Sequence, residues 1–114
     1  MEAFSLRDSS RPAAFAFARI LIFRGRYPVA ARITLGNLER DENPAYVMWK
    51  WWNHSFEGRP RSAELGRGFM DAIFQEFERG DAPTRLLIAR VFRKGEPESR
   101  LSTEEFKQAI GYRP

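Results

Sequence analysis

The stretch SAELGRGFMDAIFQEFERG (residues 62–80) decides the fold class. Its apolar residues recur three and four positions apart, at Leu65, Phe69, Met70, Ile73, Phe74 and Phe77. This spacing places them on one face of an α-helix, and Gly80 is a typical residue at a helix end. The stretch therefore predicts an amphipathic helix whose apolar face belongs to a core.

The stretches on either side carry similar start and stop signals. Prolines stand in the first turn of three of them, with Asn43 as a cap before one of these prolines. Asp81 precedes another stretch, and Ser102 and Glu105 have the spacing of a capping box. Helices are predicted at 11–24, 28–38, 44–54, 82–94 and 102–111, with Gly95 and Pro97 expected to end the helix at 82–94. A strand through 29–35 is the alternative for the second of these. We predict an all-α fold, a compact single-domain bundle of five to six short helices over residues 1–114, with 1–9 as a flexible N-terminal lead.

Composition limits the classes of protein to be considered. A chain of 114 residues that is 43% hydrophobic can bury a core of its own, and the absence of cysteine excludes disulfides, thiol nucleophiles and cysteine-ligated metals. The apolar run at 13–23 contains Arg19 and is far shorter than the roughly 20 residues that span a bilayer. We expect a cytoplasmic protein without a membrane segment, a metal or a cofactor.

The charge is unevenly distributed along the chain. The net charge is +4, and 16 of the 19 basic residues are arginine, whose planar guanidinium suits phosphate, carboxylate and aromatic groups. Residues 1–38 and 85–114 are each net positive, whereas residues 39–84 carry nine acids against six bases. Two basic ends therefore flank an acidic middle, and both could contribute to one basic face.

Two runs of basic residues contain no acid, one between Asp8 and Glu39 and the other between Asp81 and Glu96. An ordinary solvated surface mixes both signs of charge, so these runs favour an anionic partner. The predicted phosphate-binding residues are Arg19, Arg24, Arg26, Arg32, Arg85, Arg90, Arg93 and Lys94. On the helix predicted at 82–94, the last four are expected to face outward, whereas Leu87, Ile88, Val91 and Phe92 face inward. Phosphate contacts of this kind provide affinity and register without sequence specificity.

All three tryptophans lie within one helix predicted at 44–54. Trp49 and Trp52 share a face and are core candidates, whereas Trp51 points about 100° away from Trp52 and is expected to leave that interior. Two interpretations of Trp51 stay open: a platform on which a base stacks, or the edge of a second core layer or subunit contact. The predicted stacking or interface site consists of Trp51, Lys50, Arg59 and Arg61.

No arrangement typical of catalysis is present. His54 is the only histidine, and the chain lacks the spacings of a zinc site or a nucleophile elbow. Gly66 and Gly68 lack the third glycine of a dinucleotide fingerprint, and we expect them to let two helix backbones approach closely. We predict that the protein is not an enzyme.

The sequence leaves two functional hypotheses. The first is a non-enzymatic nucleic-acid-binding protein, DNA or RNA, that contacts phosphates through arginine-rich helix faces and stacks a base on Trp51. The alternative is a small protein-docking subunit, adaptor or inhibitor of a larger complex, protein or nucleoprotein, that presents its tryptophans and arginines to an acidic protein surface. Self-association is compatible with both.

Overall fold

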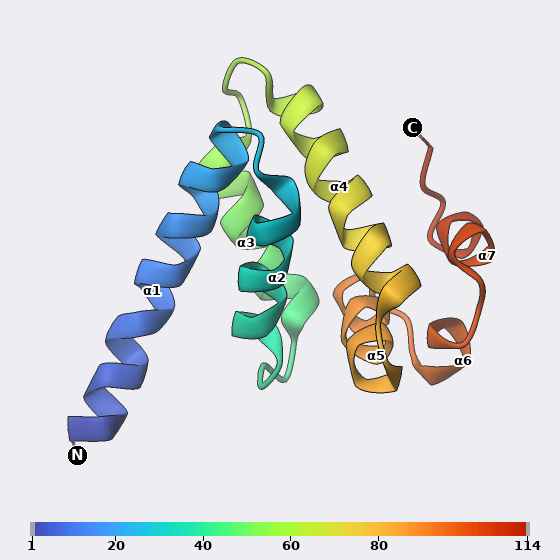
Figure 1. The fold of residues 1–114 in the computed structure, drawn as a ribbon, viewed down its shortest axis with the longest axis horizontal. Coiled ribbons are helices and arrows are strands. Elements are labelled where there is room, and N and C mark those ends of the chain that lie inside the picture. Colours follow the sequence, from blue (N-terminus) through green and yellow to red (C-terminus); the bar gives the residue numbers. More distant parts are fainter. Residues whose placement is uncertain (1, 114) are drawn as a thin grey trace.

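The computed structural model describes the backbone of residues 2–113 and the side chains of residues 11–113, and all regular secondary structure in this part is helical (Figure 1). Its helices are α1 (Glu2–Phe23), α2 (Tyr27–Leu38), α3 (Pro44–Phe56), α4 (Ser62–Arg79), α5 (Ala82–Val91), α6 (Glu96–Ser99) and α7 (Thr103–Ala109). Residues 2–113 thus hold seven helices where five to six were predicted. The all-α prediction is confirmed, and the alternative strand at 29–35 is wrong because α2 covers it.

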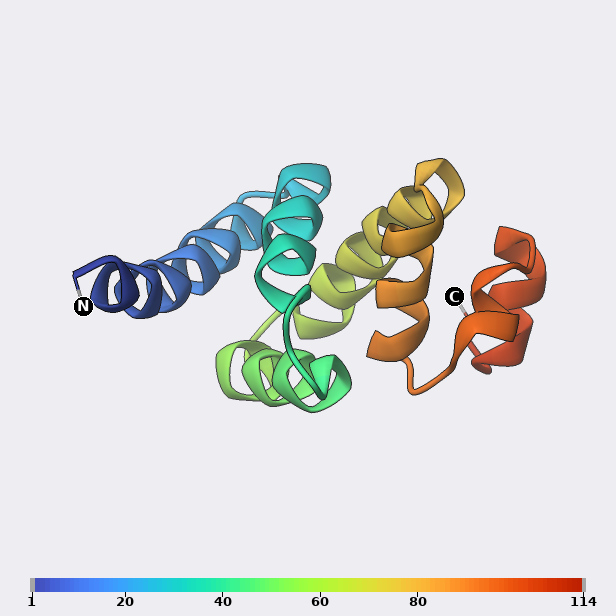
Figure 2. The ribbon, with the colours of Figure 1, turned by 90° about the horizontal axis from the view of Figure 1, so that it is seen from below.

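Helix α4 runs through the middle of the molecule, with α1–α3 on one side of it and α5–α7 on the other (Figures 1 and 2). Its predicted apolar face is confirmed, since Leu65, Phe69, Ile73 and Phe77 are all buried. Side chains from both flanking groups pack onto this face in a single core cluster. The protein is therefore one compact all-α domain. No helix in the described part is long and apolar enough to cross a membrane.

The predicted caps set where three helices begin. The Asn43 side chain accepts a hydrogen bond from the Tyr46 amide at 3.2 Å, and Asp81 accepts one from the Thr84 amide at 3.0 Å. Ser102 and the residue three positions later, Glu105, bond to each other's amides in a complete capping box. Each cap satisfies amide groups that have no partner inside their own helix.

The main differences from the prediction are the start of α1 and the additional helix α6. Helix α1 begins at Glu2 and contains Pro12 in its interior, although proline is normally expected in a first turn because it lacks an amide proton. The backbone of α1 includes residues 2–9 of the predicted lead at 1–9, while the side chains of residues 1–10 lie outside the described part. Helix α6 was missed because Pro97, taken as a stop signal, stands in its first turn.

The same caps predict how stability depends on pH. Hydrogen bonds from the Thr84 amide lower the pKa of Asp81, and those from the amides of Gly95 and Ser102 lower the pKa of Glu98 and Glu105. A carboxyl group with a lowered folded-state pKa stabilises the fold above its unfolded pKa of about 4, and this contribution is lost as pH falls through the folded value.

Urea denaturation should therefore show a lower midpoint at acidic pH than at neutral pH. Asp81→Asn keeps a good capping residue but removes one titrating group, so it should lose less stability on acidification than the unmodified protein. An identical pH dependence in the two proteins would contradict this assignment for Asp81.

Candidate functional site

Arg85 lies half-buried between helices and does not face outward as predicted. Its guanidinium donates hydrogen bonds to the carbonyl oxygens of Phe77 at 2.8 Å and Ser99 at 2.9 Å, and to that of Leu101. It also lies 4.0 Å from the centre of the Phe77 ring. Arg85 thus joins the end of α4 to α6, and its donors are occupied by main-chain carbonyls.

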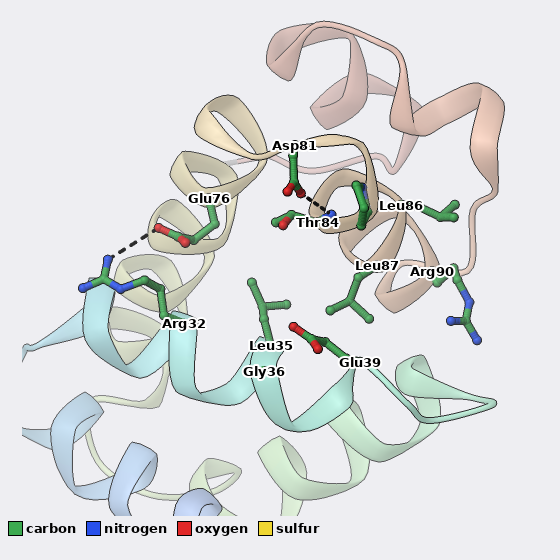
Figure 3. Close-up of a pocket in the computed structure, with 11 residues that line it drawn as sticks. Arg32, Leu35, Gly36, Glu39, Glu76, Asp81, Thr84, Leu86, Leu87 and Arg90 are labelled. Atoms are coloured by element: carbon green, nitrogen blue, oxygen red, sulfur yellow. Dashed lines mark hydrogen bonds and ion pairs between the residues drawn. The ribbon is translucent and has the colours of Figure 1, made fainter.

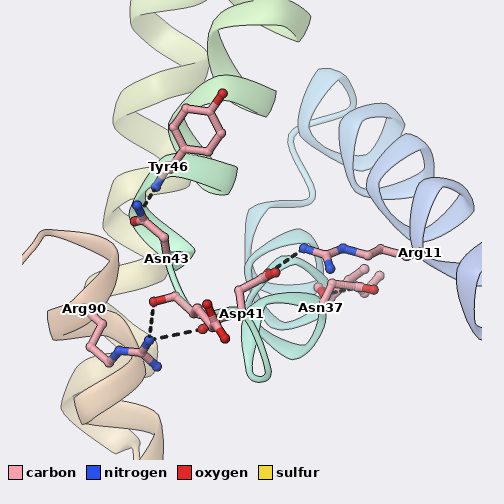
Figure 4. A network of polar contacts seen from close by, with 8 residues as sticks. Arg11, Asn37, Asp41, Asn43, Tyr46 and Arg90 are labelled. Carbon is pink, nitrogen blue, oxygen red and sulfur yellow. Dashed lines mark hydrogen bonds and ion pairs between the residues drawn. The ribbon is translucent and has the colours of Figure 1, made fainter.

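Arg90 has a similar role at the connection between α2 and α3 (Figure 4). Its Nη2 donates to the carbonyl oxygens of Asp41 at 3.1 Å and Glu42 at 2.9 Å. From the other side, Arg11 of α1 pairs with the Asp41 carboxylate at 2.5 Å. The two arginines hold this connection between α1 and α5, so the predicted outward orientation of Arg90 is only partly correct.

The remaining predicted arginines are separated in space. Arg32 of α2 pairs with Glu76 of α4 at 3.7 Å. Arg24 and Arg26 are exposed in the turn between α1 and α2, whereas Arg93 and Lys94 are exposed after α5. In Figure 1 the turn after α1 lies toward the top of the molecule and helix α5 toward the bottom. The exposed cations of these two segments therefore do not form one face, although Arg32 of the first run and Arg90 of the second line one groove.

Residues of the first basic run do meet the tryptophan helix. A cavity of about 350 Å³, here called the Trp51 pocket, opens where the middle of α1 faces the end of α3. It is lined by Pro12, Phe15, Ala16 and Arg19 of α1, by Trp51, His54 and Ser55 of α3, and by Arg59 of the next connection. Arg19, Trp51 and Arg59, which the sequence placed in two separate candidate sites, thus line one cavity.

Trp51 is half-buried, and its ring packs among other aromatic rings. Its centroid lies 5.2 Å from that of Phe15, 5.8 Å from Phe56 and 6.2 Å from both Trp52 and Phe69. The expectation that Trp51 leaves the interior of Trp52 is therefore wrong, since both indoles contact Phe56 and Phe69. Trp51 forms an aromatic wall of the pocket and is not a free platform.

The other two members of the predicted tryptophan site have local partners and do not line this cavity. The Lys50 ammonium lies 5.5 Å from the centre of the Tyr46 ring on the same helix. Arg61 pairs with Glu64 at 3.2 Å, which raises the pKa of Arg61 and lowers that of Glu64. Of the predicted stacking or interface residues, only Trp51 and Arg59 belong to the pocket.

The chemistry of the pocket is cationic and aromatic. Arg19, His54 and Arg59 supply nitrogen donors, and no lining residue is acidic. The Arg19 guanidinium also lies 5.0 Å from the centre of the Phe23 ring, which orients it along α1. Guanidinium groups beside aromatic rings suit a planar, anionic ligand. Among the described residues, no three His, Asp or Glu side chains could hold a metal ion.

The sequence reasoning missed the contribution of Phe15 and His54 to this site. The signal present for Phe15 was its spacing of four from Arg19, which places both on one side of a helix. The expected close approach of helix backbones at Gly66 and Gly68 is also wrong. The positions a Cβ would occupy face aromatic side chains instead, Trp52 at 3.6 Å from Gly66 and the Tyr27 ring at 2.3 Å from Gly68.

Comparison of the chain with protein-family models, with curated proteins and with solved structures gave no match. Function is therefore inferred from the pocket and the charges around it.

Proposed function

We propose that the protein is a non-enzymatic nucleic-acid-binding protein whose contact surface is the Trp51 pocket and the basic end of the molecule beside it. The observation that carries the proposal is the meeting of Arg19 and Arg59, distant in sequence, with Trp51 in one acid-free cavity. Phosphates would bind the guanidinium groups, and a base would enter against the aromatic wall.

The position of the neighbouring arginines supports a polymer as the ligand. Arg24 and Arg26 are exposed immediately after α1. Figure 1 shows that the turn carrying them lies at the same end of the molecule as the connection between α3 and α4, which carries Arg59. A phosphate chain leaving the pocket would therefore meet further cations, whereas a single small anion would use the pocket alone.

A protein-docking function is the second candidate, and a different surface favours it. Phe17 and Ile20 of α1 are 52% and 45% exposed and lie three residues apart on the solvent side of the helix. Large apolar side chains exposed together are typical of protein contact surfaces. This candidate predicts that changes at Phe17 and Ile20, and not at the pocket arginines, abolish the protein's interactions.

Reversal of two pocket charges tests the nucleic-acid function. Arg19→Glu combined with Arg59→Glu should weaken binding of an oligothymidine of about ten nucleotides on the order of 100-fold at near-physiological salt, because attraction to phosphate is replaced by repulsion. The log–log slope of affinity against salt should become shallower by about 0.7 for each phosphate of the single strand that the variant no longer binds. Fluorescence anisotropy measures both quantities.

Arg93→Glu combined with Lys94→Glu is the matched control, because it changes the net charge equally at residues that do not line the pocket. This variant should retain affinity within about threefold, since distant exposed charges are largely screened. Equal losses of affinity in the two double variants, both with unchanged thermal midpoints, would show attraction to overall charge and contradict a site at the pocket.

A further inference from the structure

A groove of about 510 Å³ lies between α2 and the pair α4 and α5, away from the Trp51 pocket (Figure 3). Its floor is apolar, since Leu35 and Leu87 are 5% and 7% exposed and Leu86 is half-buried beside them. Gly36 lines the groove from α2, and a Cβ at this position would meet no atom within 4 Å. The groove is thus open beside Gly36, and leucine side chains form its apolar floor.

Charged side chains of both signs surround this apolar floor, with carboxylates around the groove and arginines toward its ends. Figure 3 shows Glu39, Glu76 and Asp81 around the groove, with Arg32 and Arg90 toward its two ends. Glu76 already pairs with Arg32. Asp81 has a lowered pKa and is therefore ionised at neutral pH, and Glu39 forms no ion pair with any described residue. Two carboxylates are thus available to a cation.

Arg32, at one end of the groove, suits a ligand that offers a carbonyl oxygen. The Nη2 of Arg90, at the other end, is already occupied by the main-chain carbonyls of Asp41 and Glu42. The Arg32 side chain is 54% exposed, and its 3.7 Å separation from Glu76 is longer than a hydrogen bond, so its donors can reach a further acceptor. A polyamine supplies no acceptor and would be repelled by both guanidinium groups.

We propose that this groove binds an extended basic peptide segment of a partner protein. A lysine or arginine of the segment lies between Glu39 and Asp81, an alternate apolar side chain rests on Leu35 and Leu87, and a peptide carbonyl faces Arg32. In an extended segment successive side chains point to opposite sides. A segment that alternates basic and apolar residues therefore has one cationic edge and one apolar edge. This function is separate from the proposed nucleic-acid contact.

The test adds a short capped peptide of alternating lysine and leucine to the intact protein and measures the changes in the protein's amide chemical shifts. The expected result is saturable shifts at α2 and α5 around the groove. Gly36→Leu, which fills the groove, should weaken this binding by at least about tenfold, whereas Gly36→Ala should stay within about twofold. Glu39→Lys should weaken it by about tenfold, and Glu57→Lys, at an exposed site outside the groove, should not.

The proposal is overturned by any of four results. These are no shifts at the groove, equal binding of the alternating glutamate and leucine peptide, equal shifts of the same amides by spermidine, or equal affinities of Gly36→Leu and Gly36→Ala. Thermal midpoints of all variants establish that each is folded when the peptide is added. None of these results depends on oligonucleotide binding. Failure of the peptide proposal can therefore be distinguished from failure of the nucleic-acid proposal.

Discussion

Replacement of Arg85 by methionine should lower the free energy of unfolding by about 2–4 kcal/mol. Methionine keeps an unbranched apolar stem but removes the guanidinium, so the carbonyls of Phe77, Ser99 and Leu101 lose the donors that Arg85 supplies. Since two of these carbonyls belong to α6 and the segment after it, the loss should also appear as faster amide hydrogen exchange in α6 and α7.

Arg100→Met is the matched control for this change. Arg100 is exposed, directly follows α6 and, among the described residues, pairs only with Glu96 of that helix. An exposed pair of this kind contributes under about 1 kcal/mol, so urea denaturation should barely distinguish this variant from the unmodified protein. Comparable losses of stability in the Arg85 and Arg100 variants would contradict the structural role of Arg85.

Alanine at two helical glycines should change stability in opposite directions. In Gly68→Ala the new methyl group would lie 2.3 Å from the Tyr27 ring, so the ring or α2 must shift. The expected loss is about 1–2 kcal/mol, because the strain exceeds the gain in helix propensity. In Gly36→Ala the methyl group meets nothing within 4 Å, and the expected gain is about 0.5–1 kcal/mol.

Thermal denaturation measures both effects, since 1 kcal/mol corresponds to about 4 °C in a domain of this size. The double variant Gly68→Ala and Tyr27→Ala identifies the cause. Because removal of the ring should abolish the clash, the loss of stability in the double variant should be smaller than the sum of the losses in the two single variants. Additive losses would show that Tyr27 does not restrict residue 68.

Local signals in the sequence were sufficient to predict most helix boundaries. Asn43, Asp81 and Ser102 were predicted as caps, and each bonds to an amide three residues later. A cap involves only neighbouring residues, so its chemistry is present in the sequence itself. The position of Pro12 inside α1 was not predictable in this way, because proline in a first turn is the commoner arrangement.

The roles of individual arginines could not be predicted from the sequence. Outward and inward positions on α5 were assigned from helical periodicity, which places Leu87 and Ile88 correctly in the core. Periodicity does not reveal that Arg85 can reach carbonyls of α4 and α6, or that Arg90 can reach the connection before α3, because these contacts join residues distant in the chain. The basic run between Asp81 and Glu96 therefore combines structural arginines with exposed cations.

The Trp51 pocket likewise could not be predicted from the sequence. Arg19 and Arg59 were both predicted, but their meeting depends on the packing of α1 against the end of α3. The large aromatic rings also allow adjacent tryptophans to contact common partners, although their Cα–Cβ bonds diverge on the helix. Side-chain reach, rather than helical position alone, decides where Trp51 lies.

The most direct test of the central claim is a map of amide chemical-shift changes as an oligothymidine of about ten nucleotides is added at moderate salt. If the Trp51 pocket and the basic end beside it form the contact surface, the largest changes fall at residues 15–26 and 54–59, and the Trp51 indole proton shifts with them. Largest changes at Arg93 and Lys94, or no saturable change anywhere, would contradict the proposed function.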